Sequence, residues 1–356
     1  MQRVLIASNQ LFHFAGSELV ALEFAQHFKK RNADVVAFAN IVGGPMRKQF
    51  ERAGVPVIDD PGAIKPLTFD LVYMQHHVAA LFDYGPSPID RARSLVVLGR
   101  LSPTGFLESG GWGYESAIGD LMLANSLETA ASLTRQGCSL PVRVFHNAAP
   151  ADFHHERPHP LPDAPRRVIV VTNHEDGSLR AAIERMRERC DVLCVGLRFG
   201  KPRAVSRSLL QKHDLVVTIG KTVQYALASR VPVFVYDKHG GPGYLNDQNW
   251  KRAAAHNFSG RCTPVVRSAS DLVAAIFDGY AQGRAFAEGM DKSKLSRFFL
   301  PRYLNSLGEP TCNETRRRRL ASMPSREREM ADYVRDLQLM LRAARAAKPA
   351  MDPLRA

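Results

Sequence analysis

The sequence predicts an α/β protein of two doubly wound domains, and this prediction rests on three observations. Short, continuous apolar runs alternate with helical segments through residues 1–150 and again through residues 167–290, which is typical of parallel strands covered on both faces. At 356 residues, the chain is too long for one ordinary α/β layer. A segment with five prolines, residues 150–167, separates the two series.

The strands and helices of each series follow from these runs. The first helix is expected at residues 16–32, because apolar residues recur there at three- and four-residue spacing. In the first series we expect strands at 3–8, 34–40, 55–60, 69–75, 94–100 and 121–126, and a last one from 142. In the second series we expect strands at 167–173, 190–196, 214–220, 231–237 and 264–267, with helices at 177–190, 204–212, 221–229 and 270–283.

The sequence therefore divides into four parts. They are a first domain (1–150), a linker (151–166), a second domain (167–290) and a helical, basic tail (291–356). In the tail, Met330, Val334, Leu337, Leu341 and Ala344 form a short apolar stripe with arginines around it. The stripe leaves three alternatives open: packing on the body of the protein, a partner helix, or an anionic membrane face.

The net charge of +13 belongs to the second half of the chain. Residues 1–150 hold 13 basic and 13 acidic side chains, whereas residues 291–356 hold 15 and 8. No recognition helix, aromatic RNA-binding strand or zinc finger accompanies this charge, so nucleic acid is not an expected partner. A solvated basic surface, an anionic ligand and a membrane surface remain as explanations.

The composition also bears on the compartment and on metals. Five cysteines without a Cys-x-x-Cys pair favour a reducing cytoplasm over disulfides or structural zinc. The sequence contains no run of 18 apolar residues, so we expect no transmembrane helix. The first residues are typical of a strand and not of a signal peptide. The three linker histidines lack ligand spacing, so we expect no metal.

Two glycine-bearing turns of the second domain are candidates for binding phosphate. Gly220, Lys221 and Thr222 follow a strand at the start of a helix, where amide groups, a cation and a hydroxyl favour an anion. Leu215 stands where a P-loop needs glycine, so nucleotide hydrolysis by a P-loop is not expected. A plain strand–helix turn with an exposed lysine is the alternative.

The second glycine-bearing turn comes one strand later. Asp237 and His239 flank a glycine cluster that we expect to form a stiff loop lining the same site, and Arg261 follows with a side chain suited to phosphate. The glycines of that cluster are Gly240, Gly241 and Gly243.

The first domain supplies candidates for the other side of a cleft. Gly16 allows close approach of a ligand after the first strand, and Glu18 and His13 lie beside it. His76 ends the strand at 69–75, where an imidazole can act as a general base. Core or surface histidines remain the alternative for both His13 and His76.

The order of these segments resembles the GT-B glycosyltransferases, in particular a group involved in bacterial surface-polysaccharide assembly and similar to family 4. The resemblance covers roughly residues 1–290 and rests on "AGSE", "DLVYMQHH", "LANSLETAASL", "VFHNAAPADFH" and "ALASRVPVFVYDKHGG". It implies a GT-B fold, with two Rossmann-like domains facing a cleft, the second of which holds a nucleotide–sugar donor without metal or cofactor. It also implies that Gly220, Lys221 and Thr222 contact the diphosphate, while the 240–243 glycines contact the sugar or phosphate.

The chain departs from the family pattern where many retaining members carry two glutamates. Tyr225 stands at the second glutamate position, and Thr218 and Ile219 occupy the region of the first. The usual arginine–lysine pair after the first strand of the donor domain is also absent, and only Arg180 is nearby. Retaining and inverting chemistry therefore both stay open, and an inverting enzyme needs a base such as His76, His13 or Glu18.

These observations predict a cytoplasmic glycosyltransferase that moves a hexose-like unit to a surface polysaccharide, such as lipopolysaccharide, or to a lipid-linked glycan. A peripheral contact with the inner face of the membrane is an option that the prediction includes. Residues 314–348 are the expected membrane contact. Two rival functions are a sugar-nucleotide epimerase of the same fold and a non-catalytic, membrane-tethered assembly protein.

Overall fold

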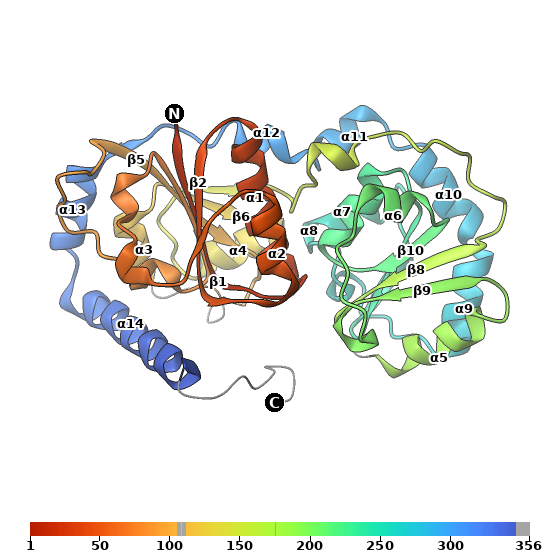
Figure 1. Ribbon diagram of the computed structural model, residues 1–356. Coiled ribbons are helices and arrows are strands. Elements are labelled where there is room, and N and C mark those ends of the chain that lie inside the picture. Colours follow the sequence, from red (N-terminus) through yellow and green to blue (C-terminus); the bar gives the residue numbers. More distant parts are fainter. Residues whose placement is uncertain (105–107, 109–111, 175, 347–356) are drawn as a thin grey trace.

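The computed structural model describes residues 1–104, 108, 112–174 and 176–346. It contains two α/β domains side by side, each built on its own sheet (Figure 1). The expected class of fold, two doubly wound domains, is confirmed.

The sheet of the first domain has the strand order β3-β2-β1-β4-β5-β6-β7, with every neighbouring pair parallel. A short strand from the tail, β13, pairs antiparallel with β5. The strands are β1 (Arg3–Leu11), β2 (Asp34–Val42), β3 (Val57–Ile58), β4 (Leu71–Gln75), β5 (Arg93–Arg100), β6 (Leu121–Ala124), β7 (Val142–Val144) and β13 (Thr311–Cys312).

Hydrophobic cores cover both faces of this sheet, which is why its strands read as continuous apolar runs. Along β1, Val4 and Ile6 point into one core, whereas Leu5 and Ala7 point into the other. All four side chains have no exposed surface. Period-two alternation between two buried faces gives a run with no polar position.

The sheet of the second domain has the order β12-β11-β10-β8-β9. The four strands β8 to β11 are parallel, and β12 is antiparallel at the edge. Its strands are β8 (Arg167–Val171), β9 (Asp191–Val195), β10 (Leu215–Thr218), β11 (Val233–Asp237) and β12 (Gly240–Tyr244).

Two expectations for the second domain, the glycine loop and the strand at 264–267, are wrong. The glycine cluster is not a loop, because Gly240, Gly241 and Gly243 belong to a strand paired with β11. A Cβ on Gly241 would lie 2.1 Å from the carbonyl oxygen of Val235, so glycine is needed for the strand to pair. Residues 264–267, expected as a strand, are irregular.

The helices connect and cover these sheets (Figure 1). Those of the first domain are α1 (Gly16–Lys30), α2 (Gly44–Arg52), α3 (Trp112–Ile118) and α4 (Leu127–Arg135). Those of the second domain are α5 (Gly177–Met186), α6 (Arg207–Gln211), α7 (Lys221–Ala228), α8 (Trp250–Ala255), α9 (Ala269–Asp278), α10 (Tyr280–Glu288) and α11 (Lys292–Ser296). The last three are α12 (Leu300–Leu304), α13 (Asn313–Ala321) and α14 (Ser325–Ala346).

The chain beyond residue 299 returns to the first domain. Leu300 and Leu304 of α12 join a core cluster of that domain, and β13 adds to its sheet. Arg316 of α13 is fully buried, and Ala331 of α14 is 1% exposed. The basic run at 316–319 is therefore partly internal, and one face of α14 packs on the body of the protein.

α14 runs along the lower edge of the first domain in Figure 1. Gln338 accepts a hydrogen bond from Asn40 of β2 at 3.2 Å. Arg335 donates to the carbonyl oxygen of Ala80, just beyond β4, at 2.8 Å. Both contacts lie toward the carboxyl ends of their strands, so α14 covers part of that edge of the sheet.

Candidate functional site

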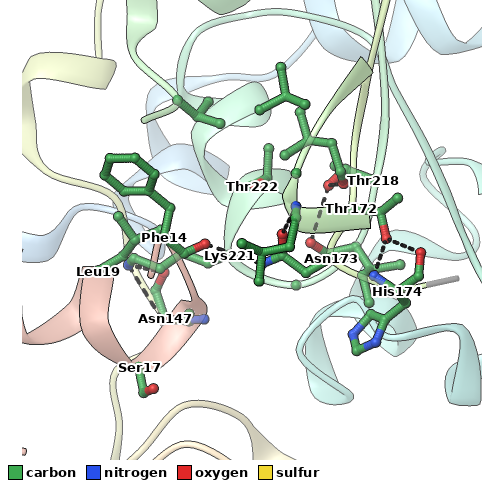
Figure 2. A pocket seen from close by; sticks show the side chains of 18 of the residues that line it. Phe14, Ser17, Leu19, Asn147, Thr172, Asn173, His174, Thr218, Lys221 and Thr222 are labelled. Carbon is green, nitrogen blue, oxygen red and sulfur yellow. Dashed lines mark hydrogen bonds between the residues drawn. The ribbon is translucent and has the colours of Figure 1, made fainter. Parts of the chain in front are cut away.

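A cavity of about 230 Å³ lies between the two domains. Figure 2 shows Phe14, Ser17 and Leu19 of the first domain on one side of it and residues of the second domain on the other. Its wall comprises Phe14, Gly16, Ser17, Leu19, Leu101, Asn125, Asn147, Val171, Thr172, Asn173, His174, Val195, Gly196, Leu197, Pro202, Arg203, Val205, Thr218, Ile219, Gly220, Lys221, Thr222 and Asn257.

The topology of the second domain explains why the cavity lies there. β8 has β9 on one side and β10 on the other. The connections that leave the carboxyl ends of β8 and β10 therefore diverge, which leaves a crevice at the switch point between them. α1 begins directly after β1 of the opposite domain, so its N-terminus borders the same space.

The N-terminus of α7 forms the wall beyond β10. Gly220 has φ +58° and ψ −137°, a conformation that favours glycine, and no side chain caps the helix. The first amide groups of a helix have no partner within the helix. With the hydroxyl group of Thr222 beside them, these amides suit an anion.

The sequence analysis missed two basic residue types in the cavity wall. Arg203 and His174 belong to the irregular segments after β9 and β8, and both line the cavity. Among the described residues of the wall there is no aspartate or glutamate. Burial lowers the pKa of His174, so the positive charge of this wall comes from Arg203. No sequence motif marks either residue.

Asn173 and Gly196 hold together the two segments that carry these side chains. The Asn173 side chain accepts a hydrogen bond from the Leu197 amide at 3.1 Å and donates one to the Phe14 carbonyl of the first domain at 3.2 Å. A Cβ on Gly196, where φ is +141°, would lie 1.8 Å from the Thr172 carbonyl oxygen. A glycine at the last position of a predicted strand was the only sign of this close approach in the sequence.

The structure brings together four of the residues expected to bind the donor. Gly16, Gly220, Lys221 and Thr222 all border the cavity. The Lys221 ammonium, expected at the diphosphate, is instead buried and lies 2.7 Å from the Glu23 carboxylate. Its backbone lies at the wall, but its charge is neutralised behind it.

The other residues expected to bind the donor lie elsewhere. The Asp237 carboxylate accepts hydrogen bonds from the amides of His239 at 2.7 Å and Gly260 at 3.3 Å, so it shapes the turn between β11 and β12. Arg261 pairs with Glu128 of the first domain at 2.9 Å, beside a neighbouring hollow. None of these side chains, nor the β12 glycines, belongs to the described wall.

Glu18 is unsuited to the role of an acceptor base. One carboxylate oxygen accepts hydrogen bonds from the Phe12 and His13 amides, both at 2.8 Å, and the residue has no exposed surface. Burial raises the pKa of Glu18, and the two amides oppose that rise. Glu18 therefore holds the β1–α1 loop, and His13 lies in that loop outside the described cavity wall, with its ring 4.6 Å from Phe12.

His76 directly follows β4 and has φ +63°, an unusual conformation for a residue with a side chain. Its Nδ1 lies 3.4 Å from both the Asn9 amide nitrogen and the Ser8 hydroxyl oxygen. Burial lowers the pKa of His76 to about 4, so the ring is neutral at pH 7. Because the Asn9 N–H points at Nδ1, the neutral ring carries its proton on Nε2.

Metal and membrane features were searched in the described part of the chain. There, no group of three or more histidine, cysteine, aspartate or glutamate side chains could hold a metal ion. None of its helices is both long enough and apolar enough to cross a bilayer. The cysteines of the chain are free thiols.

The layout is that of the GT-B fold, two Rossmann-like domains with a cavity between the carboxyl ends of their sheets. Protein-family models and curated protein sequences give no match. Solved structures do align with most of the chain. A glycosyltransferase from Rickettsia africae is 11% identical and covers 90% of this chain and 99% of its own, with a TM-score of 0.48.

Two further solved structures also align with most of this chain at low sequence identity. The lipopolysaccharide outer core galactosyltransferase WaaB is 12% identical over 81% of this chain and 99% of its own, with a TM-score of 0.42. A Listeria monocytogenes protein provisionally assigned as a UDP-N-acetylglucosamine 2-epimerase is 13% identical over 82% and 94%, with a TM-score of 0.48. At these values the likeness concerns the layout of the chain, so we argue function from the residues.

Proposed function

We propose that this protein transfers a sugar from a nucleoside diphosphate sugar to a cell-surface polysaccharide or lipid-linked glycan acceptor, without a metal ion. One observation carries the proposal: two helix N-termini, from opposite domains, border one cavity whose described wall holds the Arg203 guanidinium and no carboxylate. A diphosphate is a compact anion that this arrangement favours. When the sugar bond breaks, the negative charge increases on the leaving diphosphate, and the same groups stabilise it.

The donor would lie mainly against the second domain. The amides at the start of α7, the Thr222 hydroxyl and the Arg203 guanidinium surround the space for the diphosphate. Val195, Leu197 and Val205 give an apolar surface on which a base can pack. The cavity is smaller than the range of about 300–1,000 Å³ usual for ligand sites, so the sugar would extend toward the first domain.

The first prediction concerns Arg203. Arg203→Ala should weaken binding of the preferred nucleoside diphosphate about tenfold, because a charge-assisted hydrogen bond contributes roughly 1.5–3 kcal/mol and this side chain is exposed. Isothermal titration calorimetry with uridine, guanosine, cytidine and thymidine diphosphates measures it. Arg187→Ala, at the far end of α5, removes the same charge from the same domain and should leave the affinity unchanged.

Calorimetry also separates the enzyme from its rival. If the wild-type protein binds none of the four diphosphates, the donor site is refuted and a non-catalytic assembly protein becomes the better explanation. If Arg203→Ala binds as tightly as wild type, Arg203 has no part in the site.

His76 is our candidate for the residue that meets the acceptor. It directly follows β4, beside Asn9 of β1, and lies outside the described cavity wall. With the ring proton on Nε2 and a pKa of about 4, the imidazole would donate a hydrogen bond and not remove a proton. This revises the general-base role expected for it.

We also propose that α14 makes the peripheral membrane contact expected of residues 314–348, of which 347 and 348 lie outside the described residues. Two of the α13 arginines are poor candidates, since Arg316 is buried and Arg317 pairs with Asp90. α14 instead exposes an apolar stripe on one side. Its members are Met330, Tyr333, Leu337, Met340 and Leu341.

The second prediction tests this stripe. Leu337→Glu combined with Met340→Glu should lower co-sedimentation with vesicles of phosphatidylglycerol and phosphatidylcholine several-fold, because it places charge in the stripe. Leu339→Glu is the control, because Leu339 is equally exposed but lies on another side of the helix. Equal sedimentation of both variants would refute the contact. Deletion of the tail is a poor test because it removes core residues.

A further inference from the structure

A buried contact between the two domains lies directly behind the cavity. Lys221, the first residue of α7, places its ammonium nitrogen 2.7 Å from one carboxylate oxygen of Glu23 on α1. Tyr225, one turn along α7, donates a hydrogen bond to the other oxygen. The Lys221 and Glu23 side chains are only 4% and 7% exposed, so each charge depends on the other domain for its partner.

The same contact includes the segment where the chain crosses between the domains. The Lys221 ammonium lies 3.2 Å from the Ala148 carbonyl oxygen and 3.4 Å from the Asn147 carbonyl oxygen. The Tyr225 ring stacks on Phe153 with ring centres 4.1 Å apart and an angle of 7°. One side-chain cluster thus joins α1, α7 and the crossing segment.

The environment makes this contact costly to break on one side only. Burial raises the pKa of Glu23 and lowers that of Lys221, and in each case the opposite charge works against the effect of burial. Removing one member leaves a buried charge without its counter-charge, whereas removing both does not. Domain movements that keep the contact intact are therefore favoured over those that separate it.

The contact also has a defined relation to the cavity. Glu23 lies two turns along α1 from Gly16, and Lys221 is the first residue of α7, so the contact connects the two helices whose N-termini border the cavity. We infer that Glu23, Lys221 and Tyr225 are positioning residues that fix the relative orientation of the domains, and with it how the two helix N-termini face each other. Their effect on nucleotide affinity rests on the proposed function.

The experiment compares Glu23→Gln, Lys221→Met and the double variant with wild type. In small-angle X-ray scattering, each single variant should have a larger radius of gyration, and the double variant should return toward the wild-type value. In calorimetry, both single variants should weaken diphosphate binding by a similar factor, about tenfold, and the double variant should be no weaker than either. Asp152→Asn, which breaks an exposed pair with Lys30 on the same helix, is the control.

The outcomes separate this inference from its rivals. If Lys221→Met weakens binding and Glu23→Gln does not, Lys221 contacts the ligand itself and the inference fails. Wild-type scattering from both single variants also overturns it. If a single variant does not fold, Tyr225→Phe, which keeps the ion pair, should shift the scattering in the same direction by less, and no shift refutes the inference. Scattering needs no nucleotide, so it decides the matter even if the donor site is refuted.

Discussion

Arg316→Ala should lower the free energy of unfolding by about 3–5 kcal/mol, the usual cost of removing one member of a buried ion pair. The Arg316 guanidinium has no exposed surface, lies 2.5 Å from the Asp120 carboxylate, and donates to the Ile118 carbonyl oxygen at 2.6 Å. It also donates to the Ser94 carbonyl oxygen of β5 at 3.1 Å. The substitution leaves these acceptors buried without their donor.

Urea denaturation followed by circular dichroism measures this loss. Arg318→Ala is the matched control, because Arg318 lies two residues away on the same helix with 79% of its side chain exposed and one partner, Glu314. It should change the free energy of unfolding by no more than about 0.5 kcal/mol. Equal stability of the two variants would show that α13 does not dock as described.

His76→Gln should lower kcat for sugar transfer about 10²-fold and leave nucleotide affinity unchanged, on the scale seen when one preorganised donor is removed from a reaction site. The pH dependence separates His76 from a general base of ordinary histidine pKa. Because the pKa of His76 is about 4 in the folded protein, the neutral ring is already fully populated at pH 6. The rate of wild type should therefore be level from pH 6 to pH 8. It should fall below about pH 5, because a second ring proton on Nδ1 would face the Asn9 N–H and displace the ring.

The pH profile of His76→Gln completes this test. The variant should lose the fall in rate at low pH, because glutamine does not titrate. A wild-type rate that rises through pH 6 to 7 would instead indicate a general base of ordinary histidine pKa. His159→Gln, on the exposed linker, controls for the loss of a histidine and should keep the wild-type rate and profile.

The strands of both sheets could be predicted because burial on two faces leaves a local mark in the sequence. Val4 to Ala7 need only be apolar to satisfy either core, so no knowledge of their partners was required. Gly241 was wrongly expected in a loop, because its role depends on a partner strand and leaves no local mark in the sequence. Its lack of a side chain serves close contact with Val235, and that requirement appears only when the two strands are placed together.

The site was predictable only in part, because its charges depend on distant pairings. The position of Lys221 at the start of α7 followed from a strand–glycine–helix pattern. Its partner Glu23, 198 positions earlier, is an ordinary helical glutamate in the sequence. Arg203 lies in a segment without periodicity, so nothing local distinguished it from the other arginines of the second domain.

The return of the chain to the first domain affects how the protein is made. While the ribosome has produced only residues up to 299, the second domain already has its full set of core residues, including Leu295 and Phe298. The first domain, although synthesised earlier, still lacks Leu300, Leu304 and Arg316. The domain that begins first can thus reach its final packing only last, and its exposed apolar surface must be protected in the meantime.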